Sequence, residues 1–235
     1  ILSLIISPNN IQYGAPRADT VLDREGFANG YSYSKYQPLW VAYRLTDHNV
    51  TNKVCSRDID TFKTDKFNNH KSAEPSDYTR SGYDRGHIAP AGDMAWSTNA
   101  MRNAYFMSNM SPQVPQFNRG IWKDIEAKVR DFAIQEGSIY VYSGPIFTTN
   151  NCRTVIGKTC SIEVPEAYYK VLLSEKEPRT MIGFILKNEA STNDLITFVT
   201  TVDEVEKRTG LDFFNTLPDD VESVLESTVI TNRWF

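Results

Sequence analysis

One long amphipathic segment in the middle of the chain constrains the fold more than any other feature. Within residues 118–136, apolar side chains recur at spacings of three and four, at Ile121, Ile125, Val129, Phe132 and Ala133. On a helix this spacing forms one apolar stripe, which must be buried against another layer. Asn118 is a favoured capping residue and Gly137 a favoured helix-ending residue, so we predict a helix over 118–136.

Strand-like runs surround this segment and supply that layer. A hairpin is predicted within residues 31–45, with its turn at 35–38. Further strands are predicted after the helix, at residues 138–143, 168–173, 181–186 and 195–200. Thr201 and Glu204 have capping-box spacing, which predicts a short helix that ends at Gly210. Runs of strands with a few separate helices indicate the α+β class.

Nothing in the sequence divides the chain into parts. Residues 46–82 are polar and are predicted to form a long irregular excursion, and long loops inside compact domains tend to be functional. There is no repeat, low-complexity tract or linker, so we predict a single domain over residues 1–235.

The overall charge does not by itself favour a polyanionic ligand. The chain has 25 basic and 29 acidic residues, whereas proteins that bind phosphate backbones usually carry a basic excess. A local basic cleft can nevertheless lie on an acidic body. Basic residues gather in the middle third of the chain, at Arg80, Arg85, Arg102, Arg119, Lys123, Lys128 and Arg130.

The cysteines argue against a zinc ribbon, because no two of the three have Cys-x-x-Cys spacing. Cys152 and Cys160 flank a short segment, and a disulfide between them, worth about 2.5 kcal/mol, is the favoured interpretation. Such a bond would indicate an oxidising compartment, with Cys55 left as a buried thiol. No apolar stretch approaches the roughly 20 residues that span a bilayer, so we expect no membrane partner.

One of the three histidines has neighbours that suggest chemistry. His48 and His70 are expected to be surface or core residues, whereas His87 ends the sequence Asp84-Arg85-Gly86-His87. Phosphodiester hydrolysis needs a base for the attacking water, and a neutral imidazole with a pKa near 6.5 suits that task. Charge that develops on the phosphoryl oxygens must be met by a metal ion or by guanidinium groups.

The predicted helix carries candidates for the metal. Magnesium prefers oxygen ligands and keeps several waters, so the amide oxygen of Asn118 can suffice as its direct protein contact. Glu126 lies eight residues later, about 12 Å along a continuous helix, so we expect it to act through a metal-bound water. Arg130 is four residues further on and shares a helix face with Glu126.

Three segments together resemble the DNA/RNA non-specific endonucleases, the ββα-metal nucleases that include mitochondrial endonuclease G. They are the Asp-Arg-Gly-His box at 84–87, the Ser-Asn-Met-Ser-Pro-Gln segment at 108–113 and the Asn-x-x-x-Trp-x-x-x-Glu pattern at 118–126. The resemblance covers roughly residues 30–216. It implies a central antiparallel sheet layered between helices, with a ββα-metal element that carries the site.

The resemblance also implies roles for residues. His87 matches the general base, and Asn118 matches the protein ligand of a hydrated Mg²⁺, for which Mn²⁺ should substitute. Glu126 and Arg130 match residues that support the metal waters and the phosphate. Two further arginines, Arg57 and Arg85, match catalytic positions. The residues expected to contact substrate are Arg85, Asn109 and Arg119.

From these roles we expect an enzyme that cuts DNA and RNA internally, leaving 5′-phosphate and 3′-hydroxyl ends with little sequence preference. A catalytically silent interaction domain and a small-phosphodiester hydrolase are the two alternatives. The expected partners are both nucleic acids and a protein inhibitor, and the chain is expected to be a monomer or a homodimer. We expect secretion or a periplasmic location, with a mitochondrial location as the alternative.

Overall fold

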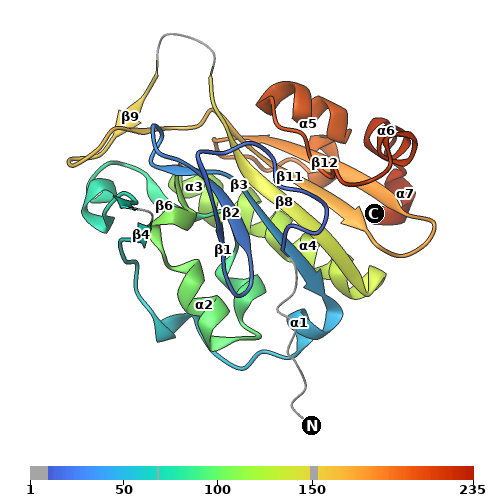
Figure 1. Ribbon diagram of the computed structural model, residues 1–235, viewed down its shortest axis with the longest axis horizontal. Coiled ribbons are helices and arrows are strands. Elements are labelled where there is room, and N and C mark those ends of the chain that lie inside the picture. Colours follow the sequence, from blue (N-terminus) through green and yellow to red (C-terminus); the bar gives the residue numbers. More distant parts are fainter. Residues whose placement is uncertain (1–9, 68, 149–152) are drawn as a thin grey trace.

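A seven-stranded sheet crosses the middle of the computed structural model, which describes residues 10–67, 69–148 and 153–235 (Figure 1). All neighbouring strands in it are antiparallel. In spatial order the strands are β1 (Thr20–Asp23), β2 (Ala28–Ser32), β3 (Gln37–Thr46), β8 (Ser138–Ile146), β11 (Ala167–Ser174), β12 (Thr180–Lys187) and β13 (Val199–Thr200). The predicted α+β class with a central antiparallel sheet is confirmed.

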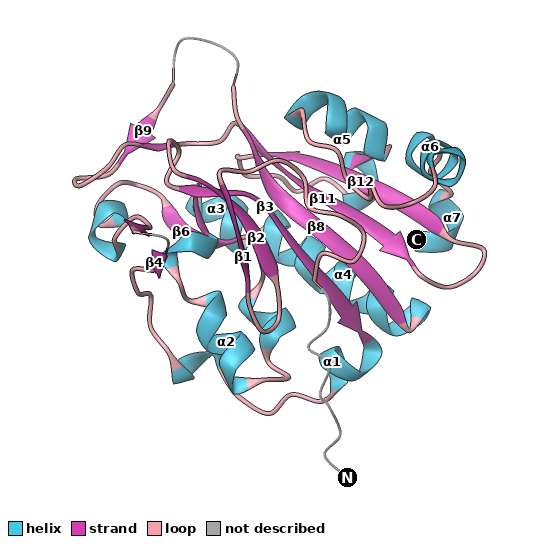
Figure 2. Ribbon diagram, in the orientation of Figure 1, coloured by secondary structure: helices cyan, strands magenta, loops and turns pink. Residues whose placement is uncertain are grey.

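The sheet is buried on both faces, with helices on either side of it (Figure 2). Successive side chains of a strand point to opposite faces. In β3, Val41 and Tyr43 therefore join one apolar cluster, whereas Trp40 and Ala42 join the other. This arrangement explains why the central strands are mostly apolar instead of alternating strictly with polar residues.

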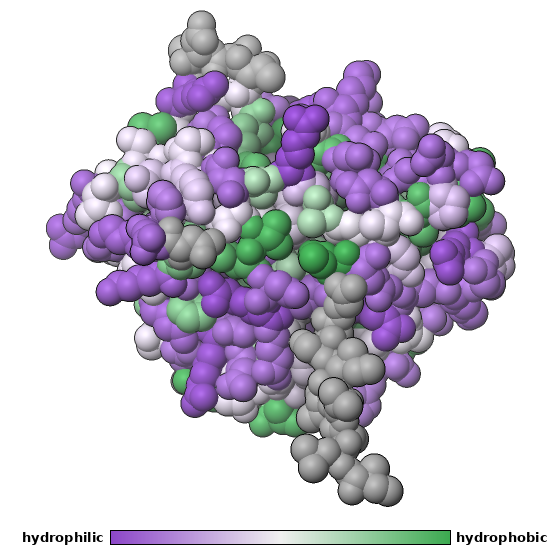
Figure 3. All heavy atoms as spheres, in the orientation of Figure 1, coloured by the Kyte–Doolittle hydropathy of each residue, from purple (hydrophilic) through white to green (hydrophobic). Residues whose placement is uncertain are grey.

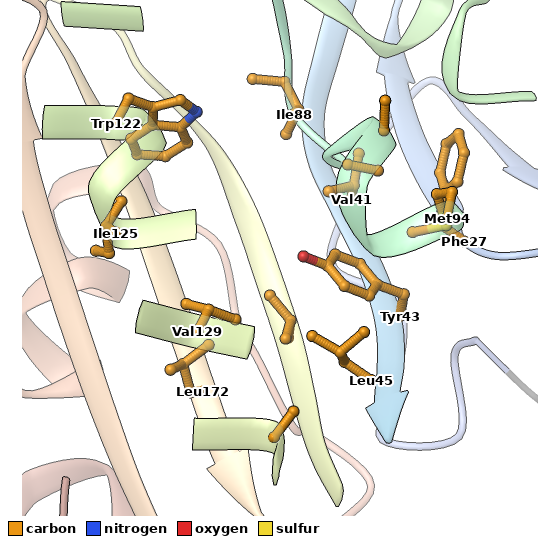
Figure 4. Close-up of a cluster of buried hydrophobic side chains, with 14 of the residues drawn as sticks. Phe27, Val41, Tyr43, Leu45, Ile88, Met94, Trp122, Ile125, Val129 and Leu172 are labelled. Carbon is orange, nitrogen blue, oxygen red and sulfur yellow. The ribbon is translucent and has the colours of Figure 1, made fainter. Parts of the chain in front are cut away.

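Helix α4 (Ile121–Glu136) covers the first face of the sheet. Its Trp122, Ile125 and Val129 point toward the strands, where they meet Tyr43 and Leu172 in one cluster (Figure 4). On the second face, α5 (Val202–Thr209) buries its two valines, and its cap Thr201 accepts a hydrogen bond from the backbone of Glu204 as predicted. The other helices are α1 (Asp47–Thr51), α2 (Thr98–Ala104), α3 (Pro115–Arg119), α6 (Asp219–Ser227) and α7 (Thr231–Trp234).

A two-stranded antiparallel sheet stands beside the main sheet and leads into α3 and α4. It pairs β6 (Asp84–His87) with β7 (Met110–Gln113), so that His87 lies opposite Met110. Strands β6 and β7 with the following helix form the expected ββα element. The remaining short elements are β4 (Lys66–Phe67), β5 (His70–Lys71), β9 (Val155–Ile156), β10 (Ile162–Glu163) and the 3₁₀ turns η1 (Arg57–Ile59), η2 (Pro75–Tyr78), η3 (Ala91–Met94), η4 (Met107–Asn109) and η5 (Leu195–Phe198).

The helix predicted over 118–136 is interrupted near its start. Asn118 lies in the last turn of α3, and Gly120 is the residue that caps α4. A Cβ atom on Gly120 would lie 2.5 Å from the carbonyl oxygen of Gln116, so the close backbone approach at this break requires glycine. Asn118 is therefore not a helix cap, and the estimate of 12 Å between Asn118 and Glu126 assumed a continuous helix that the structure does not have.

Other predictions needed smaller corrections. The hairpin turn lies two residues earlier than expected, at 33–36, because β2 ends at Ser32 and β3 already begins at Gln37. Most of the strand predicted at 195–200 is the 3₁₀ turn η5, and only its last two residues form β13. The Cys55 thiol is half-buried rather than buried, and it donates to the carbonyl oxygen of Ala95. Cys152 lies outside the described residues, so its predicted disulfide with Cys160 stays a prediction.

The face of the molecule in Figure 3 is mostly hydrophilic, with apolar side chains gathered in small areas. No helix within the described ranges is long and apolar enough to cross a membrane.

Candidate active site

A cleft of about 580 Å³ lies where β6 meets α3, α4 and the turn η3. Its lining contains most of the residues singled out from the sequence. They are Arg57, Arg85, His87, Asn118, Arg119, Glu126 and Arg130, and they are joined by Phe62, Asp84, Pro90, Ala91, Gly92 and Lys123. Segments separated by up to 73 positions in the sequence therefore meet at one site, as the family resemblance implies.

His87 ends strand β6 and is 9% exposed. Its Nε2 is enclosed and has no hydrogen-bond partner, while the residue itself lines the cleft. The rings of Phe62 and Tyr105 pack beside it, with centroids 5.5 and 5.1 Å from that of the imidazole. Burial, and then the positive charge of Arg57, lower the pKa of His87 to about 3, so the ring is neutral near pH 7.

Asn118 is oriented by the carboxylate of Asp84, the first residue of β6. Its Nδ2 donates to Oδ2 of Asp84 at 2.9 Å, and the guanidinium of Arg119 donates to both oxygens of the same carboxylate at 2.8 and 2.7 Å. Partial burial opposes ionisation of Asp84, but the hydrogen bonds from Arg119 and Asn118 outweigh it and lower the pKa of this carboxyl. The amide group of Asn118 is thereby turned so that its Oδ1 is left without a protein donor.

This arrangement fits a hard divalent cation. An amide oxygen is a ligand that Mg²⁺ and Ca²⁺ accept, and the one carboxylate on α4 that lines the same cleft is Glu126. With the helix broken at Gly120, the two side chains line one cleft from different helices. The donor set of Asn118 and Glu126 leaves most coordination positions to water, which is how magnesium is usually held in proteins.

Glu126 is half-buried in an environment of mixed charge. Burial raises the pKa of its carboxyl to about 7, while the positive charge of Lys170 opposes that rise. Lys170 comes from β11, is fully buried, and lies with its Nζ 4.4 Å from the ring centroid of Trp122 and 3.3 Å from Oγ of Ser143. A buried lysine near a half-buried glutamate favours the ionised carboxylate that a cation site needs.

Arg130 is held by a buried carboxylate rather than by Glu126. Its Nη1 lies 2.8 Å from Oδ1 of Asp93, and Oδ2 of Asp93 accepts the hydroxyl of Tyr43, also at 2.8 Å. Asp93 is fully buried and Arg130 is mostly buried. Arg130 and Glu126 are therefore not an ordinary exposed i,i+4 pair, because both side chains belong to the wall of the cleft.

The wall of the cleft is basic although the chain is acidic. Five cationic side chains line it, Arg57, Arg85, Arg119, Lys123 and Arg130, against the two carboxylates of Asp84 and Glu126. Arg85 is fixed by hydrogen bonds from its guanidinium to the carbonyl oxygen of Pro75, the shorter at 2.7 Å. Four of the seven basic residues noted in the middle third thus line a local basic cleft on an acidic body, whereas Arg80, Arg102 and Lys128 lie outside its lining.

Asn109 does not reach the cleft. It is fully buried, and its Nδ2 donates to the carbonyl oxygens of Ala89 and Ala104 at 3.0 Å each. Its Oδ1 accepts the backbone N–H of Ala89 at 2.9 Å. Because these bonds use both ends of its amide, Asn109 does not contact substrate as expected. It holds the backbone just after His87 instead. His48 and His70 also lie outside the cleft lining.

Sequence reasoning gave no role to three residues that shape this site. Asp84 and Asp93 lie inside or next to the recognised box, but their partners Asn118 and Arg130 are 34 and 37 positions away. Lys170 was hidden inside an apolar strand, where a lone lysine between Tyr169 and Val171 was the one available signal. A buried charge in such a strand needs a partner, and that rule could have identified it.

Known proteins share this sequence and architecture. Residues 7–220 match the model of the DNA/RNA non-specific endonuclease family. The chain is 32% identical to the mitochondrial nuclease of Saccharomyces cerevisiae, over 91% of this chain and 71% of that protein. It is 34% identical to nuclease C1 of Cunninghamella echinulata var. echinulata, over 90% of each. Human mitochondrial endonuclease G is 30% identical over 86% of this chain and 72% of that protein.

The fold also matches a solved structure. A chain in the crystal structure of the EndoG/EndoGI complex, which describes a mechanism of EndoG inhibition, superimposes with a TM-score of 0.82. That chain is 30% identical in sequence, and the match covers 89% of this chain and 91% of the other.

Proposed function

Because the chain belongs to the DNA/RNA non-specific endonuclease family and is a hydrolase acting on nucleic acids, we propose that His87 is its general base. The observation that carries this proposal is the place of His87 in the lining of a cleft with five cationic side chains, where burial and the charge of Arg57 keep its ring neutral. A neutral imidazole accepts the proton of an attacking water, and the surrounding cations attract the phosphate of the substrate.

The other site residues hold the substrate and the cation. Asn118, oriented by Asp84, would bind a divalent cation directly, and Glu126 would bind it through water. When bound, the cation supplies positive charge next to the scissile phosphate and the departing oxygen. The family is metal-dependent, and we propose Mg²⁺ as the ion, with Mn²⁺ as a substitute. Arg130, Arg57 and Arg85 would neutralise the phosphate oxygens, and Arg119 would contact the flanking backbone.

The products follow from the direction of attack. Water activated by His87 attacks phosphorus in line with the 3′ oxygen, which leaves a 5′-phosphate and a 3′-hydroxyl end. No step uses the ribose 2′-hydroxyl, so DNA and RNA are both substrates. Contacts to the sugar–phosphate backbone carry little sequence information, which supports cleavage with little sequence preference.

The inhibitor, the location and the oligomeric state of the enzyme are proposed next. EndoG is inhibited in its complex with EndoGI, so a protein inhibitor is proposed for this chain as well. Several relatives are named mitochondrial nucleases, which supports a mitochondrial location beside the secreted or periplasmic one expected from the cysteines. One domain over 1–235, as a monomer or a homodimer, stays the prediction, and sedimentation of the purified chain would distinguish the two states.

The experiment that tests the function is digestion of supercoiled plasmid and of total RNA with Mg²⁺, with EDTA and with the His87→Ala variant. The proposal expects internal cuts in both polymers, lost with EDTA and with the variant, and fragments that a DNA ligase rejoins without prior phosphorylation. Intact polymers at every metal and pH would instead favour a silent interaction domain. Hydrolysis of a small chromogenic diester alone would favour a small-phosphodiester hydrolase.

A further inference from the structure

Three carboxylates converge between helices α5 and α6, far from the cleft. Asp203 and Glu206 come from successive turns of α5, and Glu226 comes from the last turn of α6. One carboxylate oxygen of each lies within 4.8 Å of one oxygen of each of the others. The two helices lie beside each other near the C-terminus (Figure 1).

Glu226 is buried without a hydrogen-bond partner. It is 6% exposed, and its Oε1 has neither solvent contact nor a hydrogen bond. Glu222, one turn earlier on α6, likewise has a buried Oε1 without a partner. Buried polar atoms are almost always satisfied in native proteins, and an unpaired carboxylate is among the costliest exceptions. The unpaired oxygens of Glu226 and Glu222 therefore indicate that a ligand absent from the protein chain itself interacts with them.

Within the described residues, no cationic side chain pairs with this cluster. The cations on α5 are engaged elsewhere, since Lys207 pairs with Glu204 at 3.6 Å and Arg208 with Glu166 at 2.8 Å. No ion pair in the described part of the chain includes Glu206, Glu222 or Glu226. Burial, followed by repulsion from neighbouring carboxylates, raises the pKa of Glu226 to about 9. Burial also raises the pKa of Glu206 to about 7, although its Oε1 accepts a hydrogen bond from the backbone N–H of Phe213 that acts in the opposite direction.

We propose that Asp203, Glu206 and Glu226 form a second divalent-cation site, occupied by calcium, which fastens α6 to α5. All three ligands are carboxylate oxygens, which are the preferred donors of calcium and magnesium. Calcium is the better match because it accepts mono- and bidentate carboxylates in irregular geometry, whereas magnesium demands near-ideal octahedral coordination. The cluster contains neither sulfur nor imidazole, so it has no preference for zinc or copper.

The location separates this site from catalysis. Helix α5 packs through Val202 and Val205 on the second face of the sheet, whereas the cleft is built by α4 and β6 at the first face. Helix α6 contributes the half-buried Leu225 to the second-face cluster, so its attachment depends strongly on the contact with α5. Calcium would therefore change the stability of the folded chain and leave the chemistry of the cleft unchanged.

The experiment measures calcium binding in the Asn118→Ala background, where the ligand proposed for the catalytic ion is absent. Calorimetric titration of the EDTA-treated, dialysed protein should give one site, with a dissociation constant on the order of 0.1–1 mM or tighter. Saturation at about 100 times that constant should raise the melting temperature by about 5–10 °C. Replacing Glu226 by Gln in this background should abolish both effects, because it removes the buried ligand at nearly constant shape.

Matched variants keep the result interpretable. Glu204→Gln removes a carboxylate from the same helix outside the cluster and should leave calcium binding unchanged. Asp203→Asn, at an exposed ligand position that does not endanger folding, should weaken calcium binding at least tenfold. In otherwise wild-type protein, Glu226→Gln should cleave plasmid at the same rate as the parent in magnesium below its melting temperature.

Two outcomes would overturn the proposal. In the first, calcium neither binds to the Asn118→Ala protein nor raises its melting temperature, whereas lowering the pH does raise it. The carboxylates would then share protons instead of a cation. In the second, the Glu226→Gln and Glu204→Gln variants bind calcium equally, so the cation is held elsewhere. Neither outcome bears on the cleft, because plasmid cleavage in magnesium tests the proposed function separately.

Discussion

The carboxylate of Asp84 fixes the side-chain amide of Asn118 in one orientation, accepting its Nδ2–H at 2.9 Å. The first residue of the Asp-Arg-Gly-His box thus acts on a residue 34 positions later. The pairing decides which atom of the amide faces the cleft, because a carboxylate accepts hydrogen bonds only from the NH₂ group. As a consequence, the amide oxygen of Asn118 is available as a cation ligand, and the side chain already has the required rotamer before the cation binds.

This relationship predicts that Asp84→Ala lowers cleavage by about 10- to 100-fold, as is usual when a residue behind a metal ligand is removed. Without the acceptor, Asn118 loses its fixed orientation, so high magnesium should restore part of the rate. Arg119→Ala removes the other partner of Asp84 but leaves the amide bonded, so its magnesium dependence should stay normal. Equal magnesium dependence of both variants, measured by plasmid cleavage, would contradict the positioning role.

Arg57 should control the pH range of activity. Catalysis needs neutral His87, so the rate falls as pH drops through the pKa of this histidine. Because the charge of Arg57 helps to lower that pKa, Arg57→Gln should raise it and move the acid limb of kcat/KM to higher pH. The rate at the plateau should also fall, by about 10²-fold for one lost stabilising donor.

The control for this experiment is Lys123→Gln, which removes another cation from the wall of the cleft. Lys123 does not contribute to the lowered pKa of His87, so its loss should weaken substrate binding and leave the acid limb in place. Identical pH profiles of the two variants would mean that Arg57 does not act on His87.

The ion pair beneath the cleft should matter for stability. Asp93→Asn leaves the mostly buried guanidinium of Arg130 without its counter-charge, which should cost about 3 kcal/mol. In a chain of this size that corresponds to a melting temperature lower by about 6–12 °C. Tyr43→Phe removes one hydrogen bond to the same carboxylate and should cost only about 1 kcal/mol. Thermal unfolding of the two variants would refute this ranking if their losses were equal.

Acid should weaken the attachment of the segment around residue 159. Burial opposes ionisation of Asp77, but hydrogen bonds from the backbone N–H groups of Thr159, Glu74 and Lys158 prevail and lower its pKa to about 2. The folded chain then binds fewer protons than the unfolded chain, whose Asp77 has a pKa near 3.8. This stabilisation, about 2 kcal/mol, is therefore complete above about pH 4 and is lost as pH falls through about 2.

Urea unfolding between pH 5 and 2 measures this contribution. Asp77→Asn should remove it, so that the variant loses less stability on acidification than the parent protein. The control variant Asp131→Asn, on the exposed side of α4, should lose as much stability on acidification as the parent protein does. The explanation fails if Asp77→Asn retains the full dependence on acid.

Local patterns in the sequence were sufficient for most strands of the sheet and for α5, whereas β1 was not predicted and the ββα element was expected from the family resemblance. The strands are apolar runs with clear ends, and Thr201 and Gly210 bound their helix by local hydrogen bonding and conformation. The family resemblance located His87, Asn118 and Glu126 because the spacing of the three segments is distinctive. All of these signals are short-range or depend on the order of residues along the chain.

The features that were missed depend on contacts between distant residues. The break at Gly120 comes from the approach of one backbone segment to another within α3, which an apolar stripe with helical spacing does not report. Asn109 looked like a substrate ligand because it lies in a recognised segment, yet its amide is used up by the backbone near Ala89. Helix α6 buries Glu226 next to the carboxylates of α5, so part of its buried side is charged rather than apolar.

The most direct test of the account is chemical rescue at His87. The variant His87→Gly removes the imidazole from its position between Phe62 and Tyr105, and free imidazole should occupy the space left behind. The account predicts that cleavage of DNA and RNA is lost by about 10²–10⁴-fold and is partly restored by added imidazole, in proportion to its neutral form. Asn118→Ala should gain nothing from imidazole. Full activity of His87→Gly without imidazole would contradict the assignment of His87 as the general base.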